Sequence, residues 1–270
     1  MSLTHGNPTD LLPINWKTVI AGWYAEDTPS FDYAGFVVGS GERSATLYAK
    51  SKGILAGIPF FTEIFAQADC TVTWHINEGS MMDPGVTGKI SVATVTGPIR
   101  KLLLGERIAL NTLCRCSGVA TQSKLMLDLV RGAGYKGILA GTRKTTPGFR
   151  LVEKYGMLIG GIDTHRHDLS SMIMLKDNHI HAKGCIKNAV DAAKATGGFS
   201  LKVEVEVGNI SDANEAIDAG ADIIMLDNFQ EEELIRVARD LKSKWAPNHQ
   251  FLLECSGGLT KDNISKYIAD

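Results

Sequence analysis

Basic side chains gather in the middle of the sequence, close to short apolar runs. This cationic group consists of Arg143, Lys144, His165, Arg166 and Lys176, with Arg107 farther toward the N-terminus. Cations around one cavity repel each other, and a lysine among them shifts toward its neutral form unless anions bind. Arginine also forms bidentate, charge-assisted hydrogen bonds with carboxylates and phosphates. The group therefore predicts a binding site for a ligand with several negative charges.

Two carboxylates accompany these cations, Glu206 and Asp227, on consecutive apolar runs. Beside an anionic ligand, acidic residues are explained mainly by a divalent metal or by sugar hydroxyls. Glu204 would point to the same side of a strand as Glu206, and of the two we favour Glu206 as the contact to metal or ribose. The alternative for Asp227 is a cap on the next helix. The Asp177–His179 segment would either support the site or cap a loop.

A repeated order of apolar run, polar end and helical segment covers the chain after residue 134. The apolar runs are Gly137–Gly141, Met172–Leu175, Leu201–Val207, Ile223–Leu226 and Phe251–Leu253; the helical segments are Ile186–Ala195, Asp212–Ala219, Glu231–Lys244 and Lys261–Ile268. Strands that alternate with helices predict parallel β-structure with right-handed crossovers. In a parallel barrel the C-terminal strand ends open onto one face, so five strand ends would deliver polar groups to one site.

The first third of the chain has a different pattern, with short alternating strands and few helices. Helices are expected over Ile14–Ala25 and Phe60–Ala68, and strands near residues 45–49, 72–76 and 90–92. This mixture predicts an α+β domain over about residues 1–105. The spacing of apolar residues over Glu106–Arg131 predicts a helix, broken near Ser117-Gly118.

Composition excludes several classes of protein. The chain has 270 residues, of which 44% are hydrophobic, and 28 Lys and Arg against 30 Asp and Glu give a net charge of −2. That balance argues against nucleic-acid binding through bulk basicity, and no apolar run approaches the ~20 residues of a membrane span. Residues 1–16 do not resemble a signal peptide. Five cysteines without CxxC spacing predict a reduced, cytoplasmic protein, with the nucleus as a further compartment.

Other motifs are weaker evidence for a function. Gly132–Gly137 matches GxGxxG but precedes a strand, so no helix N-terminus is placed for a pyrophosphate and we reject it. Two HxH pairs, His165-Arg166-His167 and His179-Ile180-His181, leave zinc and a metal-dependent hydrolase as an alternative. Histidines that form hydrogen bonds in loops are favoured, because Arg166 would oppose a bound cation.

Several segments closely resemble the quinolinate phosphoribosyltransferase family, in particular its eukaryotic, fungal form. They are GERIALN at Gly105–Asn111, GTRKTTPGFR at Gly141–Arg150, LKDNH at Leu175–His179, LDN at Leu226–Asn228 and SGG at Ser256–Gly258. The resemblance runs from about Leu11 to Ile268. It implies an N-terminal α/β sandwich domain over residues 1–110, followed by an incomplete, open α/β barrel of parallel strands over residues 111–270.

The resemblance also implies an activity and roles for residues. Family members transfer a phosphoribosyl group from phosphoribosyl pyrophosphate to quinolinate, release pyrophosphate and carbon dioxide, and form nicotinate mononucleotide in NAD biosynthesis. By resemblance, the quinolinate carboxylates would be bound by Arg143, His165, Arg166 and Lys176, and by Arg107 of a neighbouring subunit. Lys144 would contact phosphoribosyl pyrophosphate, Glu206 and Asp227 the ribose hydroxyls and Mg²⁺, and Ser256, Gly257 and Gly258 the 5′-phosphate. The assembly implied is a homodimer with composite sites, or a hexamer.

Two expectations concern the limits of this resemblance. The family continues past the segment that matches Lys261–Ile268 with a further strand and a phosphate loop. We therefore expect the chain ending at Asp270 to lack the last barrel strand, and a binding subunit without catalysis is an alternative. A nicotinate phosphoribosyltransferase is the nearest enzymatic neighbour, but nicotinate has one carboxylate, for which so many cations are excessive.

Overall fold

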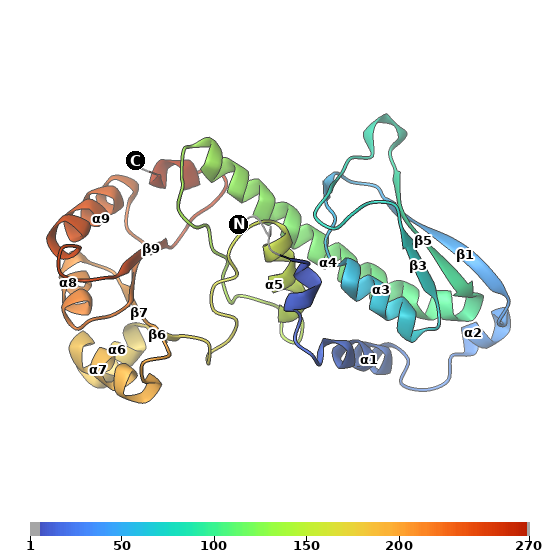
Figure 1. Cartoon of the computed structure of the whole chain (residues 1–270), viewed down its shortest axis with the longest axis horizontal. Helices are drawn as coiled ribbons and strands as arrows, with labels where there is room; N and C mark the ends of the chain where they lie inside the picture. The colour runs from blue at the N-terminus through green and yellow to red at the C-terminus, as the bar shows by residue number, and fades with distance from the viewer. Residues whose placement is uncertain (1–5, 269–270) are drawn as a thin grey trace. The chain divides into compact units, whose positions relative to one another are not determined.

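The computed structural model describes residues 6–268, which form two compact units (Figure 1). Unit 1 consists of Met1–Leu127 and Ile138–His165, and unit 2 of Asp128–Gly137 and Arg166–Asp270. The predicted domain boundary at residue 110 stays a prediction. The expectation that the last barrel strand is missing stays a prediction.

Unit 1 combines helices with antiparallel sheets. Its elements are η1 (Pro8–Leu11), α1 (Trp16–Asp27), α2 (Tyr33–Val38), β1 (Glu42–Ala49), β2 (Gly53–Ile54), α3 (Ile58–Gln67), β3 (Thr71–Trp74), β4 (Met81–Met82), η2 (Gly85–Thr87), β5 (Ile90–Pro98), α4 (Ile99–Gly132, to Leu127 in this unit) and α5 (Arg150–Ile159). One sheet has the order β1-β5-β3, and β2 pairs with β4. The helices and strands expected in this part are confirmed, and α2, α5, β2 and β4 are additional.

The core of unit 1 forms because α3 has apolar residues on one broad face. Phe61, Ile64 and Phe65 are buried against the inner side of the sheet. Phe60 packs edge-on against Trp16 of α1 and Tyr155 of α5, with ring centroids 5.6 and 5.3 Å apart. Such aromatic contacts add to the hydrophobic stabilisation of the core. They join the N-terminal helix and α5 to the sheet domain.

The predicted break in the long helix near Ser117-Gly118 is wrong, because α4 is continuous from Ile99 to Gly132. The Ser117 hydroxyl donates to the Ala56 carbonyl at 3.0 Å. The Thr121 hydroxyl donates to the Ser117 carbonyl at 2.7 Å and accepts from the Ile54 amide at 2.8 Å. The chain around β2 thus covers this side of α4, and tertiary hydrogen bonds offset the low helix propensity of glycine.

Unit 2 is a parallel α/β arrangement. Its elements are β6 (Ile173–Leu175), α6 (Asp177–Lys183), α7 (Ile186–Gly197), β7 (Val203–Val207), α8 (Ile210–Asp218), β8 (Ile223–Asp227), α9 (Glu231–Trp245), β9 (Leu252–Ser256) and η3 (Ile264–Tyr267). The strands form one sheet of order β6-β7-β8-β9 with parallel pairing throughout. The sheet is open, which confirms the predicted fold class of an N-terminal α/β sheet domain followed by an unclosed parallel-strand domain.

Two elements expected after residue 134 differ from the prediction. Gly137–Gly141 forms no strand; Ala140 makes a single bridge to Asp163, and Ile138 is 67% exposed, so the run has no buried face. The helix expected over Lys261–Ile268 is reduced to η3. There the Asn263 side chain accepts from the Thr260 amide and donates to the Gly258 carbonyl, and such local bonds compete with a helix.

Candidate active site

The parallel sheet of unit 2 has one apolar face and one polar face. Val203, Val205 and Val207 of β7 and the residues level with them pack against α7, α8 and α9 in a single core. Because successive side chains alternate across a strand, the residues between them point to the opposite face. That polar face carries Glu204 and Glu206 of β7, Asp227 of β8, and Glu254 and Ser256 of β9.

An ion pair joins two of the predicted residues on the polar face. The Lys176 ammonium, at the residue after β6, donates to Oε2 of Glu206 on the neighbouring strand. Both side chains are partly exposed, at 45% and 20%. The pair brings together a cation and a carboxylate that the sequence assigned to adjacent strand ends, and it leaves both within reach of a ligand.

Asp227 and the glycine turn lie side by side at the C-terminal ends of β8 and β9. Asp227 pairs with Ser256 in the sheet, and the Asn228 amide donates to the Ser256 carbonyl at 3.0 Å. Gly257 and Gly258 follow with φ of +98° and +64°, a region that favours glycine. A Cβ on Gly257 would lie 2.3 Å from Oδ1 of Asn228. The turn therefore needs glycine there to approach β8 so closely. The N-cap of α9 is Gln230, so Asp227 does not cap that helix.

Arg166 lies next to the polar face at β6. Its Nη2 is 3.2 Å from the sulfur of Met174, whose register partner is Glu204. The turn that follows is held by Asp168, whose side chain accepts from the amides of Ser170 and Ser171. Unit 2 thus brings Arg166, Lys176, Glu206, Asp227 and Ser256–Gly258 to one side of its sheet.

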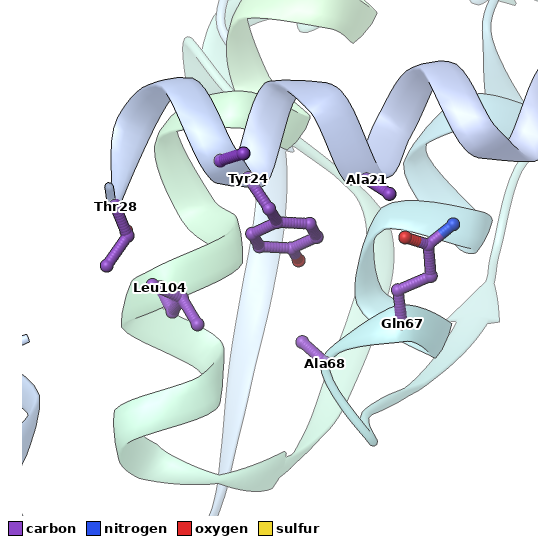
Figure 2. Close-up of a pocket in the computed structure, with 7 residues that line it drawn as sticks. Ala21, Tyr24, Thr28, Gln67, Ala68 and Leu104 are labelled. Atoms are coloured by element: carbon purple, nitrogen blue, oxygen red, sulfur yellow. The ribbon is translucent and has the colours of Figure 1, made fainter. Parts of the chain in front are cut away.

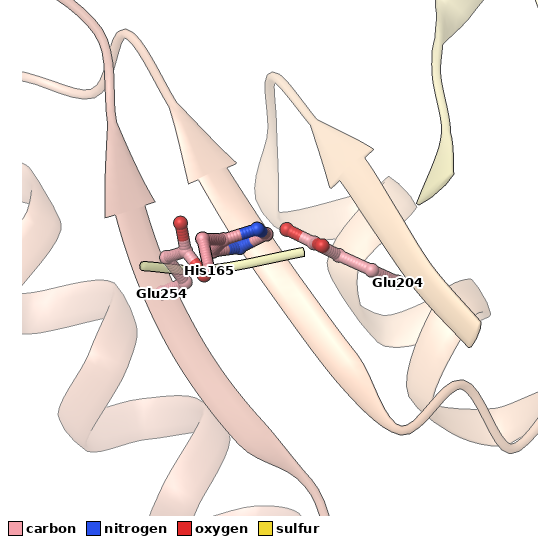
Figure 3. A group of neighbouring side chains, drawn as sticks. All are labelled: His165, Glu204 and Glu254. Atoms are coloured by element: carbon pink, nitrogen blue, oxygen red, sulfur yellow. The ribbon is translucent and has the colours of Figure 1, made fainter. Parts of the chain in front are cut away.

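Glu204 of β7 and Glu254 of β9 lie near each other on this face (Figure 3). Glu204 is fully buried, and a carboxylate oxygen of each lies within 4.8 Å of the other. Glu206 is partly exposed, and its choice over Glu204 as the contact to metal or ribose stays a prediction.

In unit 1 the predicted residues Arg143 and Lys144 lie on the loop before α5. The Nε of Arg143 is buried and has no hydrogen-bond partner among residues 6–268. A buried donor without a partner is costly, and a ligand carboxylate would satisfy it. Lys144 is exposed, and its amide donates to the Thr142 hydroxyl at 3.2 Å.

His165 ends unit 1 in a strained backbone conformation. Its φ is +56°, which is uncommon for a residue other than glycine and is often found at functional sites. The His165 amide donates to Oδ1 of Asp163 at 2.6 Å. Within residues 138–165, this bond and the Ala140–Asp163 bridge fix the backbone immediately before Arg166.

Arg107 lies on the exposed side of α4, on the turn after Leu103. Within the described part of the chain it forms no ion pair, so it is not the surface salt-bridge partner that would have explained it structurally. Its neighbour on the same side, Leu103, is 47% exposed. The side of the helix with Arg107 is therefore open for contact with another molecule.

The second HxH pair does not form a zinc site. His179 and His181 lie on α6, where residues two apart point about 200° away from each other. The Nδ1 of His179 instead accepts from the Lys176 amide at 3.0 Å. His179 therefore caps α6 and orders the backbone at Lys176.

A pocket of about 400 Å³ in unit 1 does not match the predicted chemistry (Figure 2). Its lining comes from α1, α3 and α4 and consists of Ala21, Tyr24, Ala25, Thr28, Gln67, Ala68 and Leu104. The Tyr24 hydroxyl already donates to the Ile64 carbonyl at 2.6 Å. No charged side chain lines this pocket, so a polyanion is not its ligand.

Among residues 6–268, no helix combines the length and apolar composition that a bilayer crossing requires.

Sequence reasoning missed the side chains that hold the Arg143 loop. Glu153 of α5 is 6% exposed and accepts from the Thr146 amide at 2.9 Å, the Thr146 hydroxyl at 2.7 Å and Arg115 at 2.8 Å. In the sequence, Glu153 and Lys154 look like a solvated pair of charges. The available signal was their position between apolar residues in RLVEKYG, because helical periodicity then places the charges next to a buried face.

Comparisons with known proteins agree with this geometry. The family model described as "Quinolinate phosphoribosyl transferase, N-terminal domain" matches residues 32–117, and that of the C-terminal domain matches residues 119–270. The chain is 48% identical over 257 residues to the Homo sapiens "Nicotinate-nucleotide pyrophosphorylase [carboxylating]", covering 95% of this chain and 84% of that protein. The protein of the same name from Dictyostelium discoideum is 50% identical over 271 residues, with coverage of 96% and 89%.

A solved structure with the same architecture supports the relationship. The nicotinate-nucleotide pyrophosphorylase from Francisella tularensis superposes with a TM-score of 0.83 at 30% identity, covering 97% of this chain and 90% of that chain. The matching families, the relatives of high identity and the shared fold together lead to one conclusion: the chain belongs to the quinolinate phosphoribosyltransferase family.

Proposed function

We propose that this chain transfers the phosphoribosyl group of phosphoribosyl pyrophosphate to quinolinate, with loss of carbon dioxide, and forms nicotinate mononucleotide and pyrophosphate for NAD biosynthesis. The observation that carries the proposal is the polar face of the β6–β9 sheet. There, a chain of this family gathers the Lys176–Glu206 pair, Asp227 and the Ser256–Gly258 turn.

Quinolinate suits the cations because it has two adjacent carboxylates. In unit 1, the buried Nε of Arg143 is a donor without a hydrogen-bond partner among the described residues, and His165 lies on a fixed turn. In unit 2, Arg166 and Lys176 lie at neighbouring points of the polar face. We assign these four residues to the carboxylates, with Arg107 as a further contact. A nicotinate-specific enzyme would need fewer cations.

Phosphoribosyl pyrophosphate suits the remaining groups. Its 5′-phosphate would accept from the backbone amides of Ser256, Gly257 and Gly258, where no Cβ at either glycine blocks close approach. Glu206 and Asp227 would accept from the ribose hydroxyls, and Lys144 would contact the pyrophosphate. The carboxylate oxygens of Glu206 and Asp227, at the same edge of the sheet, are also the hard donors that Mg²⁺ prefers. When bound, Mg²⁺ would neutralise charge on the departing pyrophosphate.

The reaction requires positioning and charge neutralisation, without a side-chain nucleophile. The quinolinate nitrogen attacks the anomeric carbon as the bond to pyrophosphate breaks, and the ring nitrogen becomes positive. The bond to the adjacent carboxylate then breaks, carbon dioxide leaves, and the electron pair remains on the ring carbon, which takes up a proton. Arginine and lysine fixed around the two anions would stabilise the charge that develops on pyrophosphate.

We also propose a homodimer in which Arg107 completes the site of the partner, either alone or as part of a hexamer, and a cytoplasmic or additionally nuclear location. An exposed apolar group at the start of the chain supports an assembly: Phe31, Tyr33, Phe36 and Val37 are 79%, 75%, 87% and 82% exposed. Exposed clusters of large apolar side chains mark interaction surfaces.

The decisive experiment follows carbon dioxide release from carboxyl-labelled quinolinate in the presence of Mg²⁺ and phosphoribosyl pyrophosphate. Release that needs all three components, with one nicotinate mononucleotide per carbon dioxide, supports the proposal. Tight quinolinate binding without release would favour the binding subunit instead. Product formation from nicotinate at a comparable kcat/KM would identify a nicotinate phosphoribosyltransferase.

A further inference from the structure

Helix α5 contains two adjacent ionisable side chains that are almost completely buried. Glu153 is 6% exposed and Lys154 is 2% exposed. Burial of a charge is unfavourable unless it is paired or hydrogen-bonded. Consecutive helical residues point about 100° apart, so the two side chains reach different parts of unit 1, and each one bonds to a different backbone segment.

Glu153 fixes the loop between residues 141 and 149. Its Oε2 accepts from the Thr146 amide at 2.9 Å, and its Oε1 accepts from the Thr146 hydroxyl at 2.7 Å. Arg115 of α4 donates to the same Oε1 at 2.8 Å and to the Thr146 hydroxyl at 3.1 Å. Burial raises the pKa of Glu153, but the bonds from Thr146 and Arg115 outweigh it and hold the pKa below its usual value. The carboxylate is thus ionised, and it is bonded both to Thr146 of the loop and to Arg115 of α4.

Lys154 fixes the segment before Arg166. Its Nζ donates to the carbonyl of Thr164, and the next residue, His165, has the strained φ of +56°. The Asp163 carboxylate accepts from the His165 amide, so bonds from two directions hold this turn. A strained backbone persists only where the surrounding structure fixes it in this way.

We propose that Glu153 and Lys154 are positioning residues, each of which holds one of the two backbone segments that carry substrate-binding side chains. Arg143 and Lys144 lie two and three residues before Thr146, and His165 and Arg166 lie directly after Thr164. The inference rests on the proposed function for the identity of the substrates. It adds positioning roles for Glu153, Lys154 and Thr146, whose side chains bond to the protein itself.

The two halves of the proposal predict different kinetic effects. A loosened 141–149 loop affects Arg143 and Lys144 together, so the KM for quinolinate and that for phosphoribosyl pyrophosphate both rise. A loosened turn at Thr164 affects His165 and Arg166, so the KM for quinolinate rises and that for phosphoribosyl pyrophosphate stays within about twofold. A purely structural role would lower the amount of active enzyme and leave both KM values unchanged.

The sharpest test compares Thr146→Val with Thr146→Ser, because Thr146 is exposed and neither change disturbs the core. Valine keeps the shape but loses the hydroxyl, which donates to Glu153 and accepts from Arg115. We expect it to raise both KM values by at least about three- to tenfold, the range for one lost hydrogen bond. Serine retains the donor and should behave like the wild type. Glu153→Gln, which loses the charge and one acceptor, should exceed Thr146→Val in the same direction.

Lys154→Met tests the second half. The matched control is Val152→Ala on the same helix. Val152 is 1% exposed, so the change removes a core side chain but leaves both loop contacts in place. We expect Val152→Ala to lower the thermal midpoint without a change in KM. In the folded fraction, Lys154→Met should raise the KM for quinolinate by about tenfold or more, the range for one lost hydrogen bond from a charged donor.

Hydrogen exchange keeps the inference separate from the proposed function. The amides of residues 142–146, 148 and 149 should exchange faster in Glu153→Gln, and those of residues 163–166 faster in Lys154→Met, with the other segment unchanged. Wild-type exchange rates in these segments, or equal KM values in Thr146→Val and Thr146→Ser, would overturn the positioning roles. If the wild-type chain forms no nicotinate mononucleotide but the two variants show the expected exchange changes, only the proposed function is overturned.

Discussion

Lys176 and Glu206 form an ion pair between the ends of β6 and β7, on the polar face of the unit 2 sheet. An anionic substrate that binds Lys176 must compete with Glu206, whereas Mg²⁺ or a ribose hydroxyl would take over Glu206 and release the lysine. The pair therefore links the two proposed subsites before either substrate arrives.

The first prediction concerns this pair. We expect Lys176→Met to lower kcat/KM for quinolinate by about 10- to 100-fold, the range for a lost charged hydrogen bond. Glu206→Gln should chiefly raise the Mg²⁺ concentration needed for half-maximal rate. Initial-rate measurements with each substrate and with Mg²⁺ varied separately distinguish them. Identical profiles for the two variants would contradict the separate roles.

The second prediction concerns the arginines. Arg143→Ala and Arg166→Ala should each weaken quinolinate binding by at least about tenfold, because each removes charge-assisted bonds to a carboxylate. Binding of phosphoribosyl pyrophosphate should change much less. Calorimetric titration of each ligand measures this, with the exposed Arg236→Ala of α9 as the control. Equal losses for both ligands would refute the assignment.

The third prediction concerns the glycine turn. Gly257→Ala places a Cβ 2.3 Å from Oδ1 of Asn228 at a residue with φ of +98°, so the turn must move. We expect the KM for phosphoribosyl pyrophosphate to rise by about tenfold or more and the KM for quinolinate to change little. Gly118→Ala in α4, where the new methyl meets no atom within 4 Å, serves as the control and should leave both values unaltered.

The fourth prediction concerns Glu78, which accepts from the Gly57 and Ile58 amides at the start of α3. Burial raises the pKa of Glu78 from 4.5 to about 7. The folded chain therefore holds this proton more tightly than the unfolded chain, and stability falls as pH rises from about 4.5 to about 7, then stays level. The decline amounts to ~3 kcal/mol, at 1.36 kcal/mol per pKa unit.

Urea unfolding between pH 5 and 8 measures this decline. Three of the four tryptophans, Trp16, Trp23 and Trp74, belong to unit 1, so a Trp245→Phe background makes fluorescence report on that unit alone. Glu78→Gln should flatten the pH dependence, and the exposed Glu26→Gln should not. An unchanged slope in Glu78→Gln would show that another group is responsible.

The fifth prediction tests the proposed assembly. Arg107→Ala and Lys144→Ala chains should each be inactive alone. In a mixed dimer, one of the two sites contains Lys144 from one chain and Arg107 from the other. Random mixing makes half of the dimers mixed, so about a quarter of the wild-type activity should return. No activity from verified mixed dimers would show that Arg107 does not act in the partner's site.

The parts of the fold that the sequence predicts well are those with strict periodicity. β7, β8 and α7 to α9 lie within a few residues of their predicted limits because each has an uninterrupted apolar pattern. One failure has a tertiary cause and the other a local one. Hydrogen bonds from Ser117 and Thr121 hold α4 continuous across Gly118, and Asn263 replaces a helix with a short turn. Contacts between distant segments cannot be read from local spacing.

The same distinction applies to the site. Residue types and strand ends predicted that polar groups meet at one edge of the parallel sheet. The structure adds which of them are neighbours, Lys176 with Glu206 and Asp227 with Ser256. Their proposed roles stay predictions. Glu153 and Lys154 were missed because a charged pair on a helix usually faces water. Only the three-dimensional structure shows that both are buried and that each one bonds to a loop.

The alternation of side chains in β7 has a consequence for how this sequence can change. Removal of one residue before Glu206 would shift the register by one and exchange the two faces of the strand. The valines would then lie on the polar face, and the carboxylates would enter the hydrophobic core formed with α7 and α8. A single-codon deletion there would destroy both chemistry and folding at once, whereas a two-codon deletion would preserve the facing. Length variation among descendants of this gene should therefore be confined to the connections between strands and helices.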